Sequence, residues 1–202
     1  MGKSRLEAFS DGVIAVIITI MVLELKVPHG ENLEALSELW PVFLSYVLSF
    51  VNVALYWNNH HHLFHAAHKV TGSLLWANAH WLFWMSLIPF TTAWMSENHF
   101  AQTPVALYGA VLLMCAVAYT ILSTCLTALE GEGSTLEKAR GRRDPKEMIA
   151  LAFYLTGIVL AFFVRYVSLL LYLTVAIIWI IPDRRIEKAV IEEVKEEENN
   201  SD

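Results

Sequence analysis

An arginine, a serine and an aspartate lie within seven positions of one another at the start of an apolar segment near the beginning of the chain. They are Arg5, Ser10 and Asp11, and the apolar run that follows them ends at Leu25. An ionisable residue inside a membrane span costs about 2.5–3.5 kcal/mol on insertion scales, so it usually serves a pathway, a relay or a polar network. Ser10 and Asp11 could instead cap the helix, since its free amides and dipole favour oxygen acceptors.

A run of asparagine and histidine residues ends the second apolar segment. It extends from Asn58 to His65, and its membrane depth matches that of the first segment's start. Because buried charges need partners, we predict a hydrogen-bonded network between the two helix ends. One sequence does not determine which histidine takes part, and His61 is the first choice. The predicted members are Arg5, Phe9, Ser10, Asp11, Asn58, His61 and Asn78.

The same residues allow two catalytic alternatives. His61 and His65 are four residues apart and could bind zinc, but no cysteine or well-placed carboxylate lies near them in the sequence. Ser10 and Asp11, combined with a histidine, could form a hydrolase site. However, adjacent residues on one helix point in different directions, and no nucleophile elbow is visible. We therefore predict no catalytic residues, no metal site and no enzymatic activity.

The composition is that of an all-α integral membrane protein. Of the 202 residues, 56% are hydrophobic and 17% are charged, against about 25% charged in an ordinary soluble domain. Residues 1–185 are predicted to form one six-span unit, and residues 186–202 an acidic cytosolic tail. Each span is near the length of about 20 residues that a bilayer requires. The six predicted spans are residues 9–25, 39–57, 73–95, 105–129, 148–164 and 167–181.

Lysine and arginine indicate the orientation of these spans. The chain has 14 such residues. All except Lys26 and Arg165 fall on the side of the termini, which is therefore predicted to be cytosolic. Within the third span, Pro89 is expected to kink the helix, and Thr91 or Thr92 could bond the carbonyls that it frees.

The first span carries a stripe of bulky aliphatic residues. Val16, Ile20 and Leu23 recur at spacings of four and three, and Thr19 flanks them. Such a stripe can pack against neighbouring helices. It can also form a hydrophobic constriction when several subunits present it to a common axis, because a dry neck gates ions by dewetting.

Several motifs together resemble the transmembrane protein 175 family of potassium channels. The first is Arg5-x-x-x-Phe9-Ser10-Asp11 at the opening of the first span. The second is the asparagine–histidine run after the second span. The third span adds Leu75-Trp76-Ala77-Asn78, followed by Ser86-Leu87-Ile88-Pro89-Phe90-Thr91-Thr92-Ala93-Trp94. The similarity covers about residues 5–185.

The resemblance implies a potassium-selective channel that lacks a Thr-Val-Gly-Tyr-Gly filter and, in prokaryotes, assembles as a homotetramer. It implies that the first helix lines the pore, with Val16, Thr19, Ile20 and Leu23 at its constriction. Arg5, Ser10 and Asp11 would hold the helix ends together. The expected partners are further copies of the chain and the bilayer of the cell membrane, with no nucleic acid and no cofactor, and with K⁺ as the permeant ion. The alternatives are a proton- or cation-coupled secondary transporter that uses Asp11 and the span-two histidines, and a membrane metallohydrolase. No inverted repeat in the sequence supports a transporter.

Overall fold

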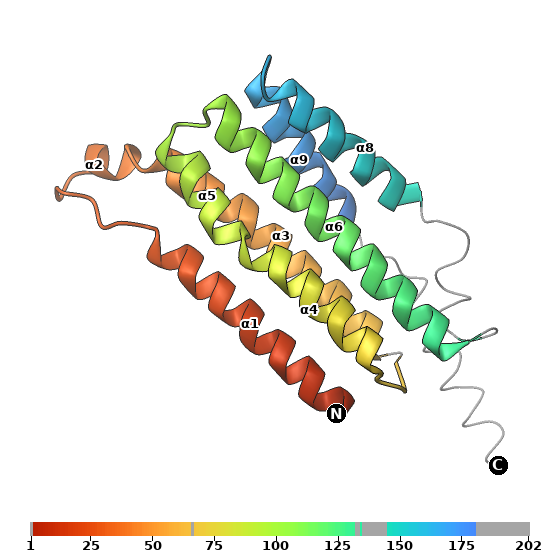
Figure 1. Cartoon of the computed structure of the whole chain (residues 1–202). Helices are drawn as coiled ribbons and strands as arrows, with labels where there is room; N and C mark the ends of the chain where they lie inside the picture. The colour runs from red at the N-terminus through yellow and green to blue at the C-terminus, as the bar shows by residue number, and fades with distance from the viewer. Residues whose placement is uncertain (1, 66, 132–133, 135–144, 181–202) are drawn as a thin grey trace, which may run out of the picture.

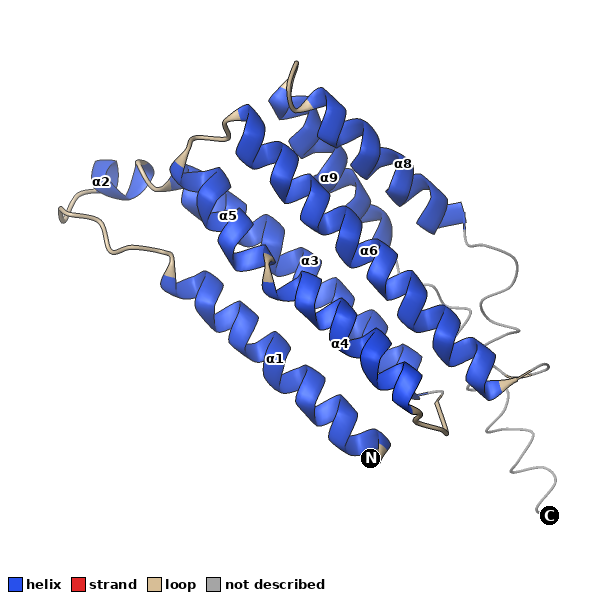
Figure 2. Ribbon diagram, in the orientation of Figure 1, coloured by secondary structure: helices blue, strands red, loops and turns tan. Residues whose placement is uncertain are grey.

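The structure is a computed structural model that describes residues 2–65, 67–131, 134 and 145–180. Every regular element in these residues is a helix (Figures 1 and 2). The helices are α1 (Lys3–Leu23), α2 (Leu33–Ser37), α3 (Trp40–His65), α4 (Gly72–Ser86), α5 (Ile88–Glu97), α6 (Gln102–Glu130), α8 (Pro145–Leu160) and α9 (Arg165–Ile180). The predicted acidic tail, residues 186–202, lies outside the described residues.

Each apolar segment predicted from the sequence overlaps one helix, except residues 73–95, which overlap two. The bounds differ at several ends: α1 begins at Lys3 rather than at Phe9, α3 continues to His65, and α8 ends at Leu160. Helices α1, α3 and α6 are long and apolar enough to cross a membrane, and α9 is a shorter apolar helix.

The third predicted span is broken into α4 and α5 at Leu87. Pro89 lies in the first turn of α5, where its missing N–H is tolerated, whereas within a continuous helix its ring would clash with the preceding turn. Thr92 Oγ1 donates to the carbonyl of Ile88 at 2.7 Å. Thr91 Oγ1 lies 3.2 Å from the carbonyls of Leu87 and Ile88. The predicted kink is therefore present, and threonine hydroxyls bond the carbonyls beside it.

The helices pack as a bundle with α1 at one side and α8 at the other (Figure 1). Helix α1 contacts α3, α4 and α5, while α6 contacts α4, α5, α8 and α9. A buried hydroxyl cluster joins three of these helices: Ser49 Oγ of α3 lies 2.7 Å from Thr92 Oγ1 and 3.0 Å from Tyr108 Oη. Such bonds are common between membrane helices, because apolar surroundings offer polar groups no other partner.

Contacts between helix ends show in which direction each helix runs through the bundle. Lys3 Nζ donates to the carbonyl of His65 at 3.0 Å, which brings the start of α1 to the end of α3. At the opposite end, Lys26 Nζ pairs with Glu97 at 2.9 Å, just beyond α1 and at the end of α5. Successive long helices therefore run in alternating directions.

Candidate functional site

A buried hydrogen-bonded chain connects α1, α4 and α3. Asn78 Nδ2 donates to Ser10 Oγ at 2.9 Å, and the Ser10 hydroxyl donates to the carbonyl of Leu6 at 2.9 Å. On the other side of the same amide, His60 Nε2 donates to Asn78 Oδ1 at 3.0 Å. The side chains of Ser10, His60 and Asn78 are 0%, 2% and 1% exposed. We call these three residues the Ser10–Asn78–His60 chain.

Aromatic rings hold His60 in place within this chain. Its ring stacks on Trp81, with centroids 4.8 Å apart and an interplanar angle of 9°. Phe64 covers the ring with a centroid distance of 4.4 Å. Because Asn78 Oδ1 can only accept a hydrogen bond, the proton at this contact belongs to His60 Nε2. Stacking and hydrogen bonding therefore fix both the orientation of His60 and the site of its Nε2 proton.

The structure places His60, not His61, against Asn78. His60 lies four residues before Phe64 and seven after Val53, on the buried face of α3. His61 is one position, or about 100°, further round the helix. It is exposed and stacks on Trp57, with centroids 6.1 Å apart. The spacing of apolar residues along the second span was the sequence signal that favoured His60.

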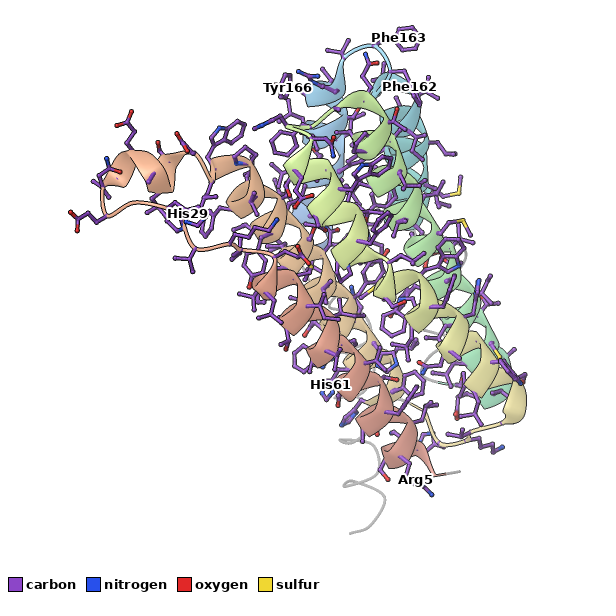
Figure 3. The ribbon with its side chains drawn as sticks, turned by 60° about the vertical axis from the view of Figure 1, so that its left-hand side comes forward. Arg5, His29, His61, Phe162, Phe163 and Tyr166 are labelled. Carbon is purple, nitrogen blue, oxygen red and sulfur yellow. The ribbon has the colours of Figure 1, made fainter. Side chains whose placement is uncertain are left out.

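The other predicted members of the network lie outside the buried chain. Asp11 is exposed, and its Oδ1 accepts a hydrogen bond from Trp57 Nε1 at 2.9 Å. Arg5 lies exposed near the start of α1, at the opposite end of the bundle from Phe162 and Phe163 (Figure 3). Phe9 is 55% exposed, and Asn58 is partly buried.

The alternative role for Ser10 and Asp11, that of helix caps, does not hold. Helix α1 begins at Lys3 with Gly2 as its N-cap, so both residues lie about two turns inside the helix. Ser10 donates its hydroxyl proton back to Leu6 four residues earlier instead of accepting a bond from a free amide.

Replacement of Asn78 tests the buried chain. An Asn78→Leu substitution should leave His60 Nε2 without its acceptor and Ser10 Oγ without its donor. Each unsatisfied group should lower the free energy of unfolding by about 1–3 kcal/mol. Ser10→Ala removes one bond and should cost about 1 kcal/mol. We expect a much lower melting temperature and folded yield for Asn78→Leu than for Ser10→Ala, measured by thermal unfolding in detergent. Equal stability of the two variants would show that Asn78 is not the centre of this chain.

Helix α1 has one covered face and one uncovered face. The covered face packs on α3, α4 and α5, and its members are Leu6, Ser10, Ile14, Ile17 and Met21. On the other face, Val16, Ile20 and Leu23 are 56%, 43% and 74% exposed. Thr19 is also exposed, and its hydroxyl donates to the carbonyl of Ala15 at 2.8 Å. The stripe predicted from the sequence is therefore not used for packing within the subunit.

The described part of the chain contains no group of three histidine, cysteine, aspartate or glutamate side chains that could hold a metal ion. The rings of His61 and His65 are neighbours, with centroids 6.3 Å apart. The zinc site considered from the sequence therefore has no third ligand of these types in the described residues.

A carboxylate at the end of α6 is hydrogen-bonded to the connection between α3 and α4. Glu130, the last residue of α6, accepts the backbone N–H of His68 at 2.7 Å and that of Lys69 at 3.3 Å. Its second oxygen lies 3.1 Å from His68 Nδ1. These contacts join the end of α6 to the connection at the end of the bundle where α1 begins.

A Glu130→Ala substitution should free this connection. The amides of His68 and Lys69 would lose their acceptor, so their hydrogen exchange should accelerate, while the core of α6 remains protected. Hydrogen–deuterium exchange with mass spectrometry measures this directly. Glu31→Ala, which changes an exposed carboxylate beyond α1, is the matched control. Unchanged exchange at residues 68–69 would show that Glu130 does not hold the connection.

Comparisons with known proteins bear on this arrangement. The family described as "Endosomal/lysosomal potassium channel TMEM175" matches residues 5–89. A potassium channel of Chryseobacterium sp. (strain P1-3) is 55% identical over 192 residues, which is 95% of this chain and all of that protein. The chain belongs to the TMEM175 family. This family is one of ion channels rather than of enzymes.

Two further TMEM175 relatives define the extent of the similarity. The crystal structure of a lysosomal potassium-selective channel TMEM175 homolog from Chamaesiphon minutus has a TM-score of 0.77 and 26% identity, and the match covers 90% of this chain and 97% of that one. The endosomal/lysosomal proton channel TMEM175 of Bos taurus is 32% identical over 181 residues. The match covers 80% of this chain but 37% of the bovine protein.

Proposed function

We propose that this TMEM175 protein is a potassium-selective channel of the cell membrane. In the proposed assembly, four subunits surround a central axis that α1 lines. Membership of a potassium channel family supports conduction. The observation that carries the role of α1 is its uncovered face, where bulky aliphatic residues project from a helix that is well packed on its opposite side.

The proposed neck consists of stacked rings of Val16, Ile20 and Leu23. Four such side chains around an axis form an apolar passage in which ions would lose water without gaining ligands, so the neck resists conduction when it is dry. Thr19 lies beside these rings. The Thr19 hydroxyl donates its proton to the carbonyl of Ala15, so the lone pairs of Thr19 Oγ1 remain available to a passing cation.

We propose six membrane crossings: α1, α3, the broken α4–α5 pair, α6, α8 and α9. The alternation of helix ends supports this topology. Lys3, His65 and Glu130 lie at one end, and Lys26, Glu97 and the α8–α9 turn lie at the other, where Gln102 Nε2 donates to the carbonyl of Phe162 at 2.9 Å. Among the described residues, Lys3, Arg5, Lys69 and Lys146 belong to the end with the N-terminus, against Lys26 and Arg165 at the other end, which favours cytosolic termini.

Within this channel, the Ser10–Asn78–His60 chain would fix the rotation of α1. A hydrogen-bonded residue on its covered face determines which residues the opposite face presents to the axis. The neighbouring contact between Asp11 and Trp57 would hold the same turn of α1 against α3. In this proposal the signature residues position the pore-lining helix and do not bind the ion.

Flux measurements with the purified protein test this function. Protein reconstituted into liposomes should conduct K⁺ down its gradient in preference to Na⁺, without a requirement for a coupled proton gradient. Empty liposomes are the control. Uptake that occurs only when protons move in exchange would instead support a proton-coupled transporter.

A further inference from the structure

The connection between α8 and α9 is apolar and exposed. It consists of residues 161–164 and leads into Arg165, the first residue of α9. The exposed apolar side chains of this turn and of the start of α9 are Phe162, Phe163, Val164 and Tyr166. Figure 3 places the three aromatic ones at one end of the bundle. A contiguous exposed apolar patch marks a surface that contacts protein or membrane.

The two other connections at this end of the bundle are polar. Residues 24–39, between α1 and α3, include four glutamates, and residues 98–101, between α5 and α6, begin with asparagine and histidine. The α8–α9 turn lies at the same end, because Gln102 Nε2 at the start of α6 donates to the carbonyl of Phe162 at 2.9 Å. Its composition therefore separates it from neighbours that suit water.

The backbone of the turn suits an environment without water. The amides of Phe162, Phe163 and Val164 donate to carbonyls three or four residues earlier, at 3.3, 2.9 and 2.7 Å. The carbonyl of Phe162 has its donor in Gln102. Unpaired backbone groups are costly in lipid, where no water can bond them. Because these groups are paired within the protein, the turn can enter the edge of the bilayer.

The lengths of α8 and α9 give the turn a reason to lie there. Each helix has 16 residues, which is about 24 Å at a rise of 1.5 Å per residue. The hydrocarbon core of a bilayer is about 30 Å thick. In the proposed topology, these two helices therefore reach across the core only if their apolar turn adds to the hydrophobic length.

Arg165 is the only charged residue between residues 148 and 180. Its guanidinium lies 5.2 Å from the centroid of the Tyr166 ring, and it makes no hydrogen bond or ion pair within the described part of the chain. Lys26, at the same end of the bundle, is instead paired with Glu97. A guanidinium binds phosphate through two parallel hydrogen bonds. A phospholipid offers that phosphate directly beside its acyl chains.

We propose that the α8–α9 turn binds the phospholipid surface of the bilayer. Phe163 and its apolar neighbours enter the upper part of the acyl chains, and Arg165 pairs with a lipid phosphate. In the proposed orientation this is the outer leaflet. The contact fixes the depth of the α8–α9 pair on the side of the subunit away from α1 (Figure 1). It goes beyond the proposed channel function and rests only on the proposed crossings of α8 and α9.

Spin labels measure the depth of the turn. Phe163→Cys is labelled in a chain whose own Cys115 and Cys125 are replaced by alanine, and the protein is reconstituted into phosphatidylcholine vesicles. The label should be accessible to oxygen, which concentrates in lipid, and shielded from the polar complex nickel ethylenediaminediacetate. Glu31→Cys, at an exposed position of the polar α1–α3 connection, is the matched control and should show the opposite preference.

Two outcomes of this measurement would overturn the proposal. Access of the nickel complex to residue 163, equal to that at residue 31, would place the turn in water. Exclusion of both oxygen and the nickel complex would place it beneath another protein surface, such as a second copy of the chain.

Lipid-dependent stability tests the role of Arg165. Because a ligand of the folded state alone stabilises it, phosphatidylglycerol added to the protein in detergent should raise the melting temperature by several degrees. Arg165→Gln should abolish most of this rise, and Arg165→Lys, which keeps the charge, should retain part of it. Lys26→Gln should leave the rise unchanged, since Lys26 is already paired with Glu97. An undiminished rise in Arg165→Gln would overturn the phosphate contact.

Inorganic phosphate separates a lipid from a free anion. At the same concentration it should give no comparable rise in melting temperature, because it lacks the acyl chains that the aromatic residues would contact. An equal rise would overturn the assignment to lipid.

Ion flux separates this proposal from the channel function. Arg165 begins α9, which packs on α3, α6 and α8. Arg165→Gln should therefore conduct K⁺ in liposomes as the wild-type protein does. Absence of the lipid effects with conduction intact would overturn the lipid contact alone, whereas normal lipid effects without conduction would overturn the channel function alone.

Discussion

Replacement of Gly109 by alanine is expected to destabilise the subunit strongly. Tyr172 of α9 is buried, and its ring lies against Gly109 of α6 and Gly157 of α8. A Cβ at Gly109 would lie 2.0 Å from Tyr172 Oη, and one at Gly157 would lie 2.4 Å from Tyr172 Cε1. Both distances are far inside van der Waals contact. The two glycines thus form a slot between α6 and α8 that holds the tyrosine ring of α9.

The expected cost follows from this geometry. Overpacking of a core typically costs about 1–3 kcal/mol, and a ring between two helices has little room to move, so we expect the upper end or beyond. For a chain of this length, that is roughly 6–12 °C in melting temperature, at about 2–4 °C per kcal/mol. Thermal unfolding in detergent, together with the yield of folded protein, measures the effect.

Two controls make this test specific. Gly72→Ala, in the first residue of α4, adds a Cβ with nothing within 4 Å and should be nearly neutral. Tyr172→Leu removes the ring and should lose stability through a cavity. The double variant Gly109→Ala with Tyr172→Leu should then lose clearly less than the sum of the two single losses. Additive losses would mean that the glycine and the tyrosine do not oppose each other.

The sequence predicts the helices of this protein better than their contacts. Runs of about 20 apolar residues mark the spans regardless of what each helix packs against, and Pro89 marks the break at Leu87 through its own covalent structure. The slot for Tyr172 could not be predicted, because Gly109, Gly157 and Tyr172 are ordinary residues until three helices bring them together.

The candidate site shows the same limit at a single residue. Their depth places Ser10 and Asn78 in one predicted network without pairing them, and in the structure they are hydrogen-bonded to each other. Depth does not separate His60 from His61, which differ by one position along α3 but face opposite environments. The contact between Glu130 and His68 joins residues 62 apart in the chain, and no local pattern marks it. In the proposed tetramer other subunits cover the outer face of α1, and contacts between subunits leave no local pattern in the sequence of one chain.

Substitutions on that outer face should change conduction more than any others in the chain. In the proposed tetramer, Val16→Asn or Ile20→Asn places four amides around the axis, so the neck becomes wet and its barrier falls. Single-channel conductance should rise several-fold. The permeability of Na⁺ relative to K⁺ should also rise, because a pore distinguishes poorly between ions that keep their hydration shells. A tenfold fall in the permeability ratio corresponds to only about 1.4 kcal/mol.

The covered face of α1 supplies the matched controls. Ile18 is partly buried against the core and Ile14 is 2% exposed, so neither can reach a central axis if the outer face does. Ile18→Asn and the milder Ile14→Val should lower stability without a change in selectivity. Single-channel currents in planar bilayers, recorded in K⁺ and in Na⁺, distinguish the two sets. If Ile18→Asn altered selectivity while Val16→Asn and Ile20→Asn did not, the axis would lie on the other side of α1, and its exposed aliphatic face would instead contact lipid.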